Sequence, residues 1–406
     1  MRMKNPLLTF RISERCQTLI TPPAQIGASP EHPSNRGSGL RSRIPLFRRV
    51  VYVLIIYGII LLSGEIATRL LVYKPSFQPF PPDVQKAMLV PHPTRSYTYA
   101  PDFSARIVTN DYTVELKTNQ LGLRDDPIVG RREKVRMLAV GDSFTFGFGV
   151  EANQTWPKQL QSMLSLESDV SGPVRVINAG ISGYGLRQMR LLLGELFDDL
   201  RPDLVIVGVY PQAYRRLQDP FVYFHGYAMS ASQVPTAGMT EDGFLFTPFT
   251  TPWARALDFW LDEHFRFAAY LLKLPTMAKD RWSRPHTDAA VESSTAEAGR
   301  QLEPLLKEIA LIDQFAHSKG TSAVVLLITP QLKNGLFERE AVVFNAAINS
   351  YCADRGIPVV DPLPEFQRLS DGTPKFRNGA DYHWSPEAHR IAADKLARSL
   401  RQQRLF

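Results

Sequence analysis

Cysteine is nearly absent from this chain of 406 residues, which contains only Cys16 and Cys352. These two residues lie too far apart in the sequence for a closely spaced metal-binding or redox pair. The eight histidines are scattered, and no spacing of His, Cys or Asp supplies three ligands for a metal ion. The sequence therefore predicts two free thiols, with no cofactor and no metal ion.

A phosphate-binding loop is missing as well. The Gly147-Phe-Gly149 segment lacks the lysine of a P-loop and the remainder of a dinucleotide-binding fingerprint. The net charge of +7 resides in residues 1–49, which carry nine Lys/Arg against two Asp/Glu, whereas the rest of the chain carries 38 of each kind. Because the positive charge belongs to a tail and not to a folded groove, we expect no nucleic-acid partner.

One long hydrophobic run is present. Residues 50–64 contain no charged side chain, and apolar residues before and after them extend the run to the roughly 20 residues that cross a bilayer. Arginines precede the run, whereas Glu65 and Arg69 follow it, so the positive-inside rule keeps the tail in the cytoplasm. We expect a single-pass inner-membrane protein that contacts lipid through this one helix and places the rest of the chain in the periplasm or outside the cell. A cleaved signal peptide and a buried core helix remain alternatives.

Composition divides the chain into five parts. Residues 75–95 hold six of the 31 prolines, which is typical of an extended linker. We expect a disordered basic tail (1–43), a transmembrane anchor (44–73), a Pro-rich linker (74–95), a small β-rich segment (96–134) and a main domain (135–406) with an insertion at 213–297.

The main domain alternates short apolar strands with amphipathic helices. This order predicts a three-layer α/β/α, flavodoxin-like parallel sheet with helices on both faces. The alternation stops at 213–297, which is rich in aromatic residues and is either a lid over a site or a packing subdomain. The expected strands are 137–140, 174–178, 204–209, 323–328 and 359–360, and the expected helices are 156–166, 186–197, 298–317, 338–355 and 386–400.

Two short motifs carry reactive side chains. The strand at 137–140 ends at Gly141-Asp142-Ser143, which places a serine at the carboxyl end of a parallel strand, where open α/β sheets bind their ligands. Near the C-terminus, Asp381-Tyr-His383 comes just before the final helix. Together the motifs supply a nucleophile, a base and an orienting carboxylate.

The order and context of these motifs resemble the SGNH (GDSL-type) hydrolase superfamily, and more narrowly its membrane-anchored bacterial members. The resemblance covers roughly residues 121–400 and implies Ser143 as nucleophile, with His383 and Asp381 completing a triad. It also implies that the Gly180 backbone and the Gln212 amide donate hydrogen bonds to the oxyanion, while Asp142 belongs to the turn beside them. The sequence departs from the family pattern at Gln212, where an asparagine is expected, and in the single residue between Asp381 and His383.

Several residues near the motifs have a structural interpretation. Asp142 is expected to hydrogen-bond the turn and Asn178 to hold the next turn, while His389 is expected to be a surface histidine of the final helix. The resemblance implies a serine esterase that removes O-acyl groups, acetyl foremost, from a cell-envelope or exported glycan. An O-acyltransferase with the same triad and a catalytically degenerate glycan-binding module are the alternatives, and no protein partner is indicated.

Overall fold

The computed structural model describes most of the main domain and parts of the regions before it. The described residues are 45–72, 82–109, 111–131, 133–166, 172–236, 238–239, 245–246, 260–261, 264–268, 270–272, 274, 295–379 and 381–405. The tail expected at 1–43, together with Cys16, lies outside them.

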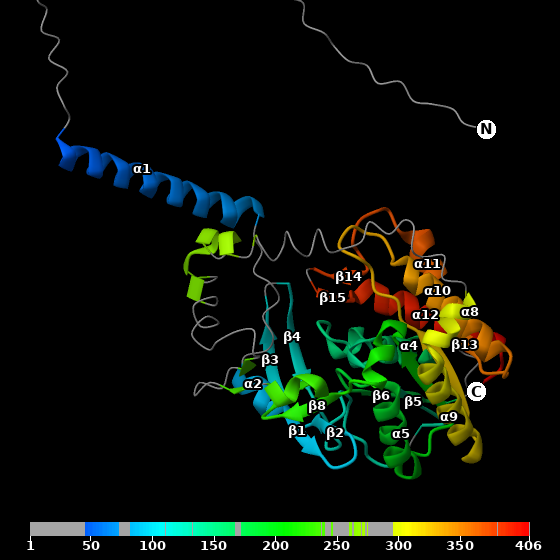
Figure 1. The fold of residues 1–406 in the computed structure, drawn as a ribbon. Coiled ribbons are helices and arrows are strands. Elements are labelled where there is room, and N and C mark those ends of the chain that lie inside the picture. Colours follow the sequence, from blue (N-terminus) through cyan, green and yellow to red (C-terminus); the bar gives the residue numbers. More distant parts are fainter. Residues whose placement is uncertain are drawn as a thin grey trace, which may run out of the picture. The chain divides into compact units, whose positions relative to one another are not determined.

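A five-stranded parallel sheet forms the centre of the main domain, in the order β13-β12-β7-β5-β6 (Figure 1). With the strands renumbered along the chain, this is the 2-1-3-4-5 order of flavodoxin-like folds. The sequence predicted all five strands to within a few residues. Their bounds are β5 (Val135–Gly141), β6 (Val174–Gly180), β7 (Leu204–Val209), β12 (Ser322–Leu327) and β13 (Val359–Val360).

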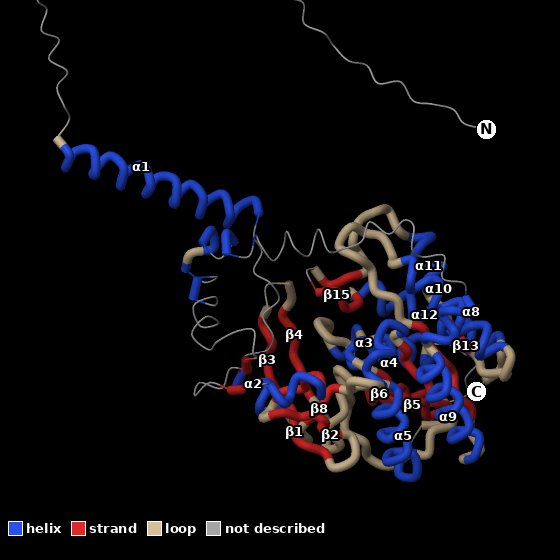
Figure 2. The backbone as a smooth tube through the Cα atoms, in the orientation of Figure 1, coloured by secondary structure: helices blue, strands red, loops and turns tan. Residues whose placement is uncertain are grey.

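Helices cover both faces of this sheet (Figure 2). Alternate residues of β5 show the division, because Met137 and Ala139 join one apolar core while Leu138 and Val140 join the other. The first core contains α4 (Trp156–Ser165), α11 (Leu363–Leu369) and α12 (Pro386–Gln402). The second contains α5 (Leu186–Leu200), α8 (Thr295–Gln301), α9 (Glu303–Ser318) and α10 (Arg339–Ala353). The predicted three-layer α/β/α fold is therefore confirmed.

Two antiparallel hairpins precede the sheet. The first pairs β1 (Leu89–His92) with β2 (Ser96–Tyr99), and the second pairs β3 (Ser104–Val108) with β4 (Thr113–Lys117). The alternating apolar residues of these strands are buried in the same core as α5: Tyr97, Tyr99, Ile107, Val114 and Leu116. This small unit packs against the main domain and is continuous with its core.

The expectation of an extended linker at 74–95 is wrong for the second half of this segment. Residues 82–88 form the helix α2 (Pro82–Met88), and β1 and the turn after it follow directly. Met88 and Leu89 are buried, and the Arg95 guanidinium bonds Glu195 and Tyr184. The prolines fit because Pro82 starts a helix and Pro91 lies in a two-stranded ribbon, positions that need no backbone N–H within a helix or central strand.

The insertion expected at 213–297 is described only in part. Its first portion contains η3 (Pro211–Leu217), β8 (Phe221–Phe224), β9 (Tyr227–Ser230) and η4 (Ala231–Thr236), followed by the short ribbon of β10 (Gly238–Met239) and β11 (Leu245–Phe246). Strands β8 and β9 form an antiparallel hairpin.

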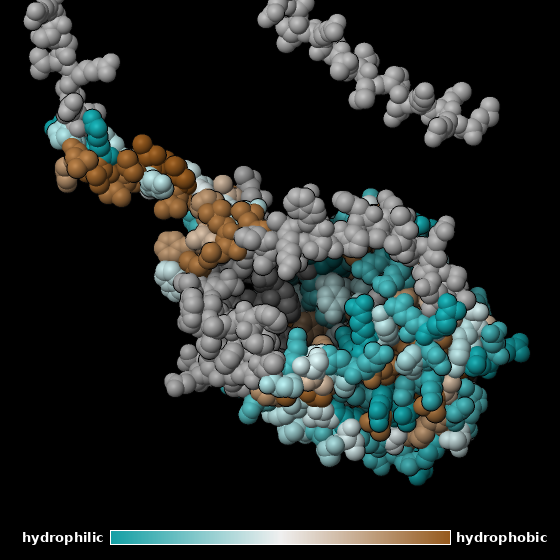
Figure 3. All heavy atoms as spheres, in the orientation of Figure 1, coloured by the Kyte–Doolittle hydropathy of each residue, from teal (hydrophilic) through white to brown (hydrophobic). Residues whose placement is uncertain are grey.

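The apolar run folds as α1 (Leu46–Ala67), which continues into a short π-helix (Thr68–Val72). An 18-residue window within residues 46–70 has a mean hydropathy of 2.3, and none of this window is buried, so the helix has the length and composition of a membrane span. Apolar side chains dominate its surface in Figure 3, with hydrophilic side chains at its start. Glu65, beyond the apolar run, accepts backbone N–H groups of Arg266 and Phe267 at 3.1 and 2.9 Å.

Candidate active site

The structure brings Ser143, His383 and Asp381 together. Ser143 Oγ lies 2.7 Å from His383 Nε2, and His383 Nδ1 lies 2.7 Å from Asp381 Oδ1. The carboxylate accepts the proton on Nδ1, which leaves the Nε2 lone pair to accept the serine hydroxyl proton. Ser143 and His383 are only 3% and 7% exposed, so the pair sits largely out of water.

Each of these three residues lies on a helix or strand that fixes its position. Ser143 begins the short helix α3 (Ser143–Phe146), directly after β5. Asp381 and His383 lie on β15 (Asp381–Trp384), which pairs with β14 (Arg377–Asn378). The next residue after His383 fastens β15, because the buried Trp384 donates its indole N–H to the carbonyl of Thr329 at 3.0 Å.

Aromatic rings surround the His383 imidazole. The ring centroids of Phe144, Phe148 and Tyr382 lie 4.8, 4.9 and 4.4 Å from its own. This packing restricts the imidazole to the rotamer that bridges Asp381 and Ser143, so little entropy is lost when the three groups align.

A cavity of about 270 Å³ opens onto Ser143 and His383. Its wall combines Ser182 and Gly183, the aromatic residues Phe148, Phe221 and Tyr382, and the ionisable residues Arg216 and Asp381. Arg216 and Phe221 both belong to the 213–297 insertion, so this segment contributes to the wall of the cavity.

Gly180 does not lie where its expected oxyanion role requires. Its N–H donates to Asn178 Oδ1 at 3.0 Å, and a Cβ atom on it would meet the Phe146 backbone nitrogen at 2.2 Å. Gly180 is therefore packed beneath α3, where only glycine fits, and its N–H is already bonded. Asn178 holds this turn as expected.

Gly183 occupies the position that the sequence assigned to Gly180. It lines the cavity beside Ser143 and has φ +83°, in the left-handed region that favours glycine. Both backbone groups of the preceding residue are held: Tyr97 Oη donates to the Ser182 carbonyl at 2.7 Å, and Ser182 N–H donates to Tyr99 Oη at 3.1 Å. Because a trans peptide points its N–H opposite to its carbonyl, the Tyr97 bond also sets the direction of the Gly183 N–H.

The repeated glycines of the segment 178–185 explain why the sequence did not separate these two roles. Gly180 ends β6 and Gly183 comes three residues later. The signal that distinguishes them is contact with Tyr97 and Tyr99, which come from a distant hairpin.

Asp142 has a structural position. Its Oδ1 accepts the Phe144 N–H at 3.0 Å, which caps α3, and its Oδ2 accepts Arg216 Nη1 at 3.0 Å. The carboxylate is fully buried and does not line the cavity at Ser143. A carboxylate cannot donate to an oxyanion, so the turn-holding interpretation fits this geometry.

Gln212 lies in η3, directly beyond β7, at the same end of the sheet as Ser143. Its side chain is outside the described part of the chain, so its predicted amide contact stays a prediction.

The expectation that His389 is a surface histidine is wrong, because its side chain is fully buried. Its Nδ1 accepts the Trp156 N–H at 3.1 Å, which ties α12 to the start of α4. Burial lowers the pKa of His389 to about 3, assisted by the nearby Arg124, so the ring stays neutral and keeps its acceptor.

Arg124 supports the site, although the sequence gave no sign of it. Its buried guanidinium donates to the carbonyls of Phe146, Gly147 and Val150 at 3.2, 2.5 and 2.6 Å. These carbonyls belong to the turn that carries Phe148 against the His383 ring. Burial lowers the pKa of Arg124 to about 10, which leaves it charged at neutral pH.

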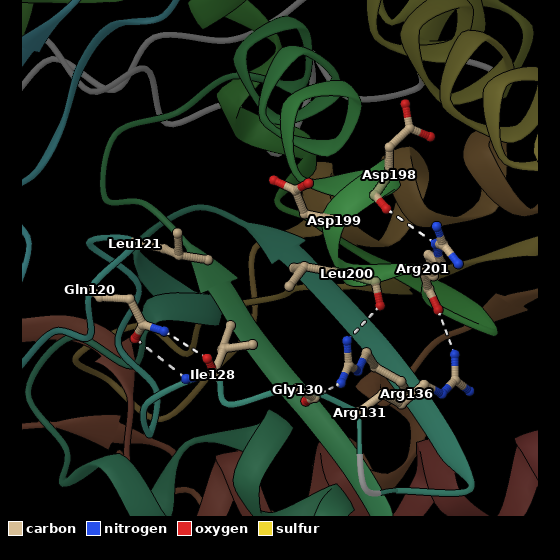
Figure 4. Close-up of a pocket in the computed structure, with 10 residues that line it drawn as sticks. All are labelled: Gln120, Leu121, Ile128, Gly130, Arg131, Arg136, Asp198, Asp199, Leu200 and Arg201. Carbon is tan, nitrogen blue, oxygen red and sulfur yellow. Dashed lines mark hydrogen bonds between the residues drawn. The ribbon is translucent and has the colours of Figure 1, made fainter.

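A larger cavity lies away from this chemistry (Figure 4). Its volume is about 550 Å³, and Arg131, Arg136 and Arg201 contribute to its wall. These arginines are engaged in structural bonds: Arg136 binds Glu133 and the carbonyls of Leu200 and Gly130, while Arg131 binds Asp203 and the carbonyl of Arg201. They brace the amino ends of the strands, and the wall contains no serine, threonine, cysteine or histidine.

A family model described as GDSL-like Lipase/Acylhydrolase matches residues 139–209, which include Ser143 and Gly183. No curated protein matched the chain. The match confirms the resemblance to the SGNH superfamily that the motifs indicated.

Solved structures of similar fold were also found. They include a putative lipolytic protein of the G-D-S-L family from Desulfitobacterium hafniense DCB-2 (14% identity, 66% of this chain and 100% of that chain, TM-score 0.36). Others are the esterase EstA from Pseudoalteromonas sp. (12%, 66% and 97%, 0.36) and the acetylxylan esterase Axe2 from Geobacillus stearothermophilus (16%, 67% and 95%, 0.36). At these TM-scores the likenesses carry no conclusion about the reaction of this chain.

The family match over residues 139–209, the sheet order and the Ser143 site together make this chain similar to GDSL-type serine hydrolases, a class of enzymes that act on ester bonds.

Proposed function

We propose that Ser143, His383 and Asp381 form the catalytic triad of an esterase. The two 2.7 Å contacts that join these residues carry the proposal. Ser143 Oγ attacks the ester carbonyl carbon while His383 Nε2 takes the hydroxyl proton, and Asp381 stabilises the imidazolium. When the tetrahedral intermediate collapses, the carbon–oxygen bond to the alcohol breaks, and His383 returns the proton to the departing alcohol. Water, deprotonated by His383, then releases the acid from Ser143.

In this proposal two backbone N–H groups stabilise the tetrahedral oxyanion. Ser143 N–H lies at the first position of α3, where a helix leaves its donors without internal partners. Gly183 N–H lies at the same cavity, and among the described residues neither group has a hydrogen-bond acceptor. Each such donor contributes about 2.7–4 kcal/mol to the barrier reduction. Gln212 is the third donor in this proposal.

The substrate that we propose is an O-acyl group, acetyl foremost, on a cell-envelope or exported glycan. The cavity beside Ser143 holds about 270 Å³ and mixes aromatic rings with an arginine, which supports a small acyl group attached to a polar alcohol. The glycan rests on the resemblance to membrane-anchored bacterial relatives and on the compartment proposed below.

We also propose that α1 anchors the chain in the inner membrane, with the catalytic domain in the periplasm. The 25-residue span at 46–70 and its arginine-rich N-terminal flank support this orientation. Fusions of a periplasm-active and a cytoplasm-active reporter at residue 74 test it. Activity of only the periplasmic reporter is expected, and a fusion protein released from membranes by carbonate would contradict the anchor.

The alternative with a specific observation behind it is transfer of the acyl group to a glycan hydroxyl. Phe148, Phe221 and Tyr382 face the Ser143 cavity, and apolar walls of this kind disfavour water as the second nucleophile. The chemistry on the enzyme is the same until the acyl-serine forms.

One experiment separates the two reactions. The full chain in detergent receives an acetyl ester with and without an acceptor glycan, and released acetate and acetylated glycan are both quantified. Acetate production that equals ester consumption supports the esterase, whereas acetylated glycan as the dominant product supports the transferase. Turnover that persists unchanged in Ser143→Ala would contradict both and favour a glycan-binding module.

A further inference from the structure

A second cavity adjoins the one at Ser143. It has a volume of about 210 Å³, and Arg216 and Phe221 line both cavities. The two cavities therefore adjoin at Arg216 and Phe221, with Ser143 in the wall of the first and Arg187 in the wall of the second. We call this pair of cavities the Arg216 groove.

The titratable side chains that face the second cavity are all cationic: Arg95, Arg187 and Arg216. Carboxylates balance two of them: Asp142 is buried, whereas the Glu195 side chain is 34% exposed and also accepts the Thr94 hydroxyl of the cavity wall. Glu195 accepts Arg95 Nε at 2.9 Å, and the fully buried Asp142 accepts Arg216 Nη1 at 3.0 Å. Arg187 is exposed on α5, and within the described ranges it has no hydrogen-bond or ion-pair partner. The surface of the groove therefore presents positive charge.

Arg216 is fixed in place before any ligand arrives. Its Nη1 donates to Asp142 and to the Tyr184 carbonyl, at 3.0 and 3.2 Å, and the guanidinium also hydrogen-bonds the Tyr382 side chain. The guanidinium carbon lies 5.4 Å from the centre of the Phe221 ring, and the side chain is 14% exposed. Because a guanidinium has five N–H donors, Arg216 retains donors for a ligand beyond these partners, and its planar shape suits carboxylate and phosphate groups.

We propose that the Arg216 groove binds an anionic group on the sugar chain that carries the acyl ester. The substrate class is then an O-acylated acidic glycan, in which a carboxylate or phosphate near the ester contacts Arg216 and Arg187. This inference rests on the proposed esterase or transferase function of Ser143. Its physical basis is that a preorganised, partly desolvated arginine gains more from an anion than from a neutral hydroxyl.

The test compares kcat/KM of the full chain on an acetylated neutral glycan and an acetylated polyuronate, in wild type, Arg187→Gln and Arg398→Gln. Arg398 is a matched control, because it is an exposed arginine of α12 whose ion pair is with Asp394, outside the groove. We expect a polyuronate preference in wild type that falls about tenfold in Arg187→Gln and declines with salt. The preference should persist in Arg398→Gln.

Equal kcat/KM on the two glycans in wild type, or an unchanged preference in Arg187→Gln, would overturn the proposal that the groove binds an anionic group. Binding measurements keep this outcome separate from failure of the esterase itself. Ser143→Ala protein is titrated with deacetylated polyuronate and with a phosphate-bearing glycan. Binding that weakens when Arg187→Gln is added supports the groove without any turnover, and the tighter ligand distinguishes carboxylate from phosphate. Absence of binding to both glycans would contradict the proposal.

Discussion

His383 Nε2 lies 2.7 Å from Ser143 Oγ, although 240 residues separate them in the chain. The contact joins the first strand of the parallel sheet to the segment before the last helix. Asp381 completes the arrangement from within the same four-residue strand as His383.

The first prediction concerns Asp381. Asp381→Asn keeps the size of the side chain but favours the wrong imidazole tautomer, so we expect kcat to fall by roughly 10⁴. Ester hydrolysis by purified variant and wild type measures this loss. A fall of less than about tenfold, with the thermal unfolding midpoint unchanged, would remove Asp381 from the proposed triad.

The second prediction tests Gly183. A Cβ atom there would lie 2.6 Å from Tyr97 Oη and 2.7 Å from the Phe221 ring, at a backbone φ of +83°. Gly183→Ala should therefore displace the proposed oxyanion donor and lower kcat by about 10²–10³.

Gly194 provides the matched control for this substitution. It lies in α5, and a Cβ atom added there has no neighbour within 4 Å. We expect Gly194→Ala to retain full activity and to gain up to about 1 kcal/mol of stability. Equal kcat for the Gly183 and Gly194 variants would contradict the role of Gly183.

The third prediction links pH to stability through His389. Its pKa is about 3 in the folded chain against an ordinary value of 6.5, so the unfolded state binds one more proton between these values. Stability from this group is complete above about pH 6.5 and declines as the pH falls, by about 1.4 kcal/mol per unit. His389→Asn removes this contribution to the slope while retaining an acceptor for the Trp156 N–H. Urea unfolding of both proteins between pH 6.5 and 4.5 measures it, and parallel pH dependences would show that His389 does not stay neutral.

The fourth prediction concerns the buried Arg124. Arg124→Met leaves the carbonyls of Phe146, Gly147 and Val150 without this donor, and we expect a loss of about 3–5 kcal/mol in the free energy of unfolding. The variant should also lose activity, because the turn that it braces holds Phe148 against His383. Urea titration and ester hydrolysis check the two effects. A variant as stable as wild type would mean that other groups or water satisfy these carbonyls.

The sequence predicted the sheet and the order of the motifs because these depend on local pattern. Runs such as Met137–Val140 are apolar on both faces, which is typical of a central parallel strand. The Gly141-Asp142-Ser143 turn that follows indicates where this strand ends. The roles of Gly180 and Gly183 could not be separated in this way. Their difference comes from tertiary contact with Tyr97 and Tyr99 of the N-terminal hairpin.

The two groups that the sequence missed or misplaced are buried polar side chains. His389 reads as one more polar residue of an amphipathic helix, yet it is enclosed against Trp156. Arg124 gives no periodic signal at all, because its partners are backbone carbonyls of a turn more than 20 residues away. Burial of such groups is decided by which elements pack together, and local sequence does not contain that information.

The central claim is that Ser143 is an activated nucleophile. The full chain in detergent is treated with a fluorophosphonate, and the site of labelling is located by peptide mass spectrometry in wild type, Ser143→Ala and His383→Ala. We predict stoichiometric labelling of Ser143 in wild type, none in Ser143→Ala and a rate reduced by orders of magnitude in His383→Ala. A folded wild-type protein that stays unlabelled, or that is labelled equally fast without His383, would contradict the account.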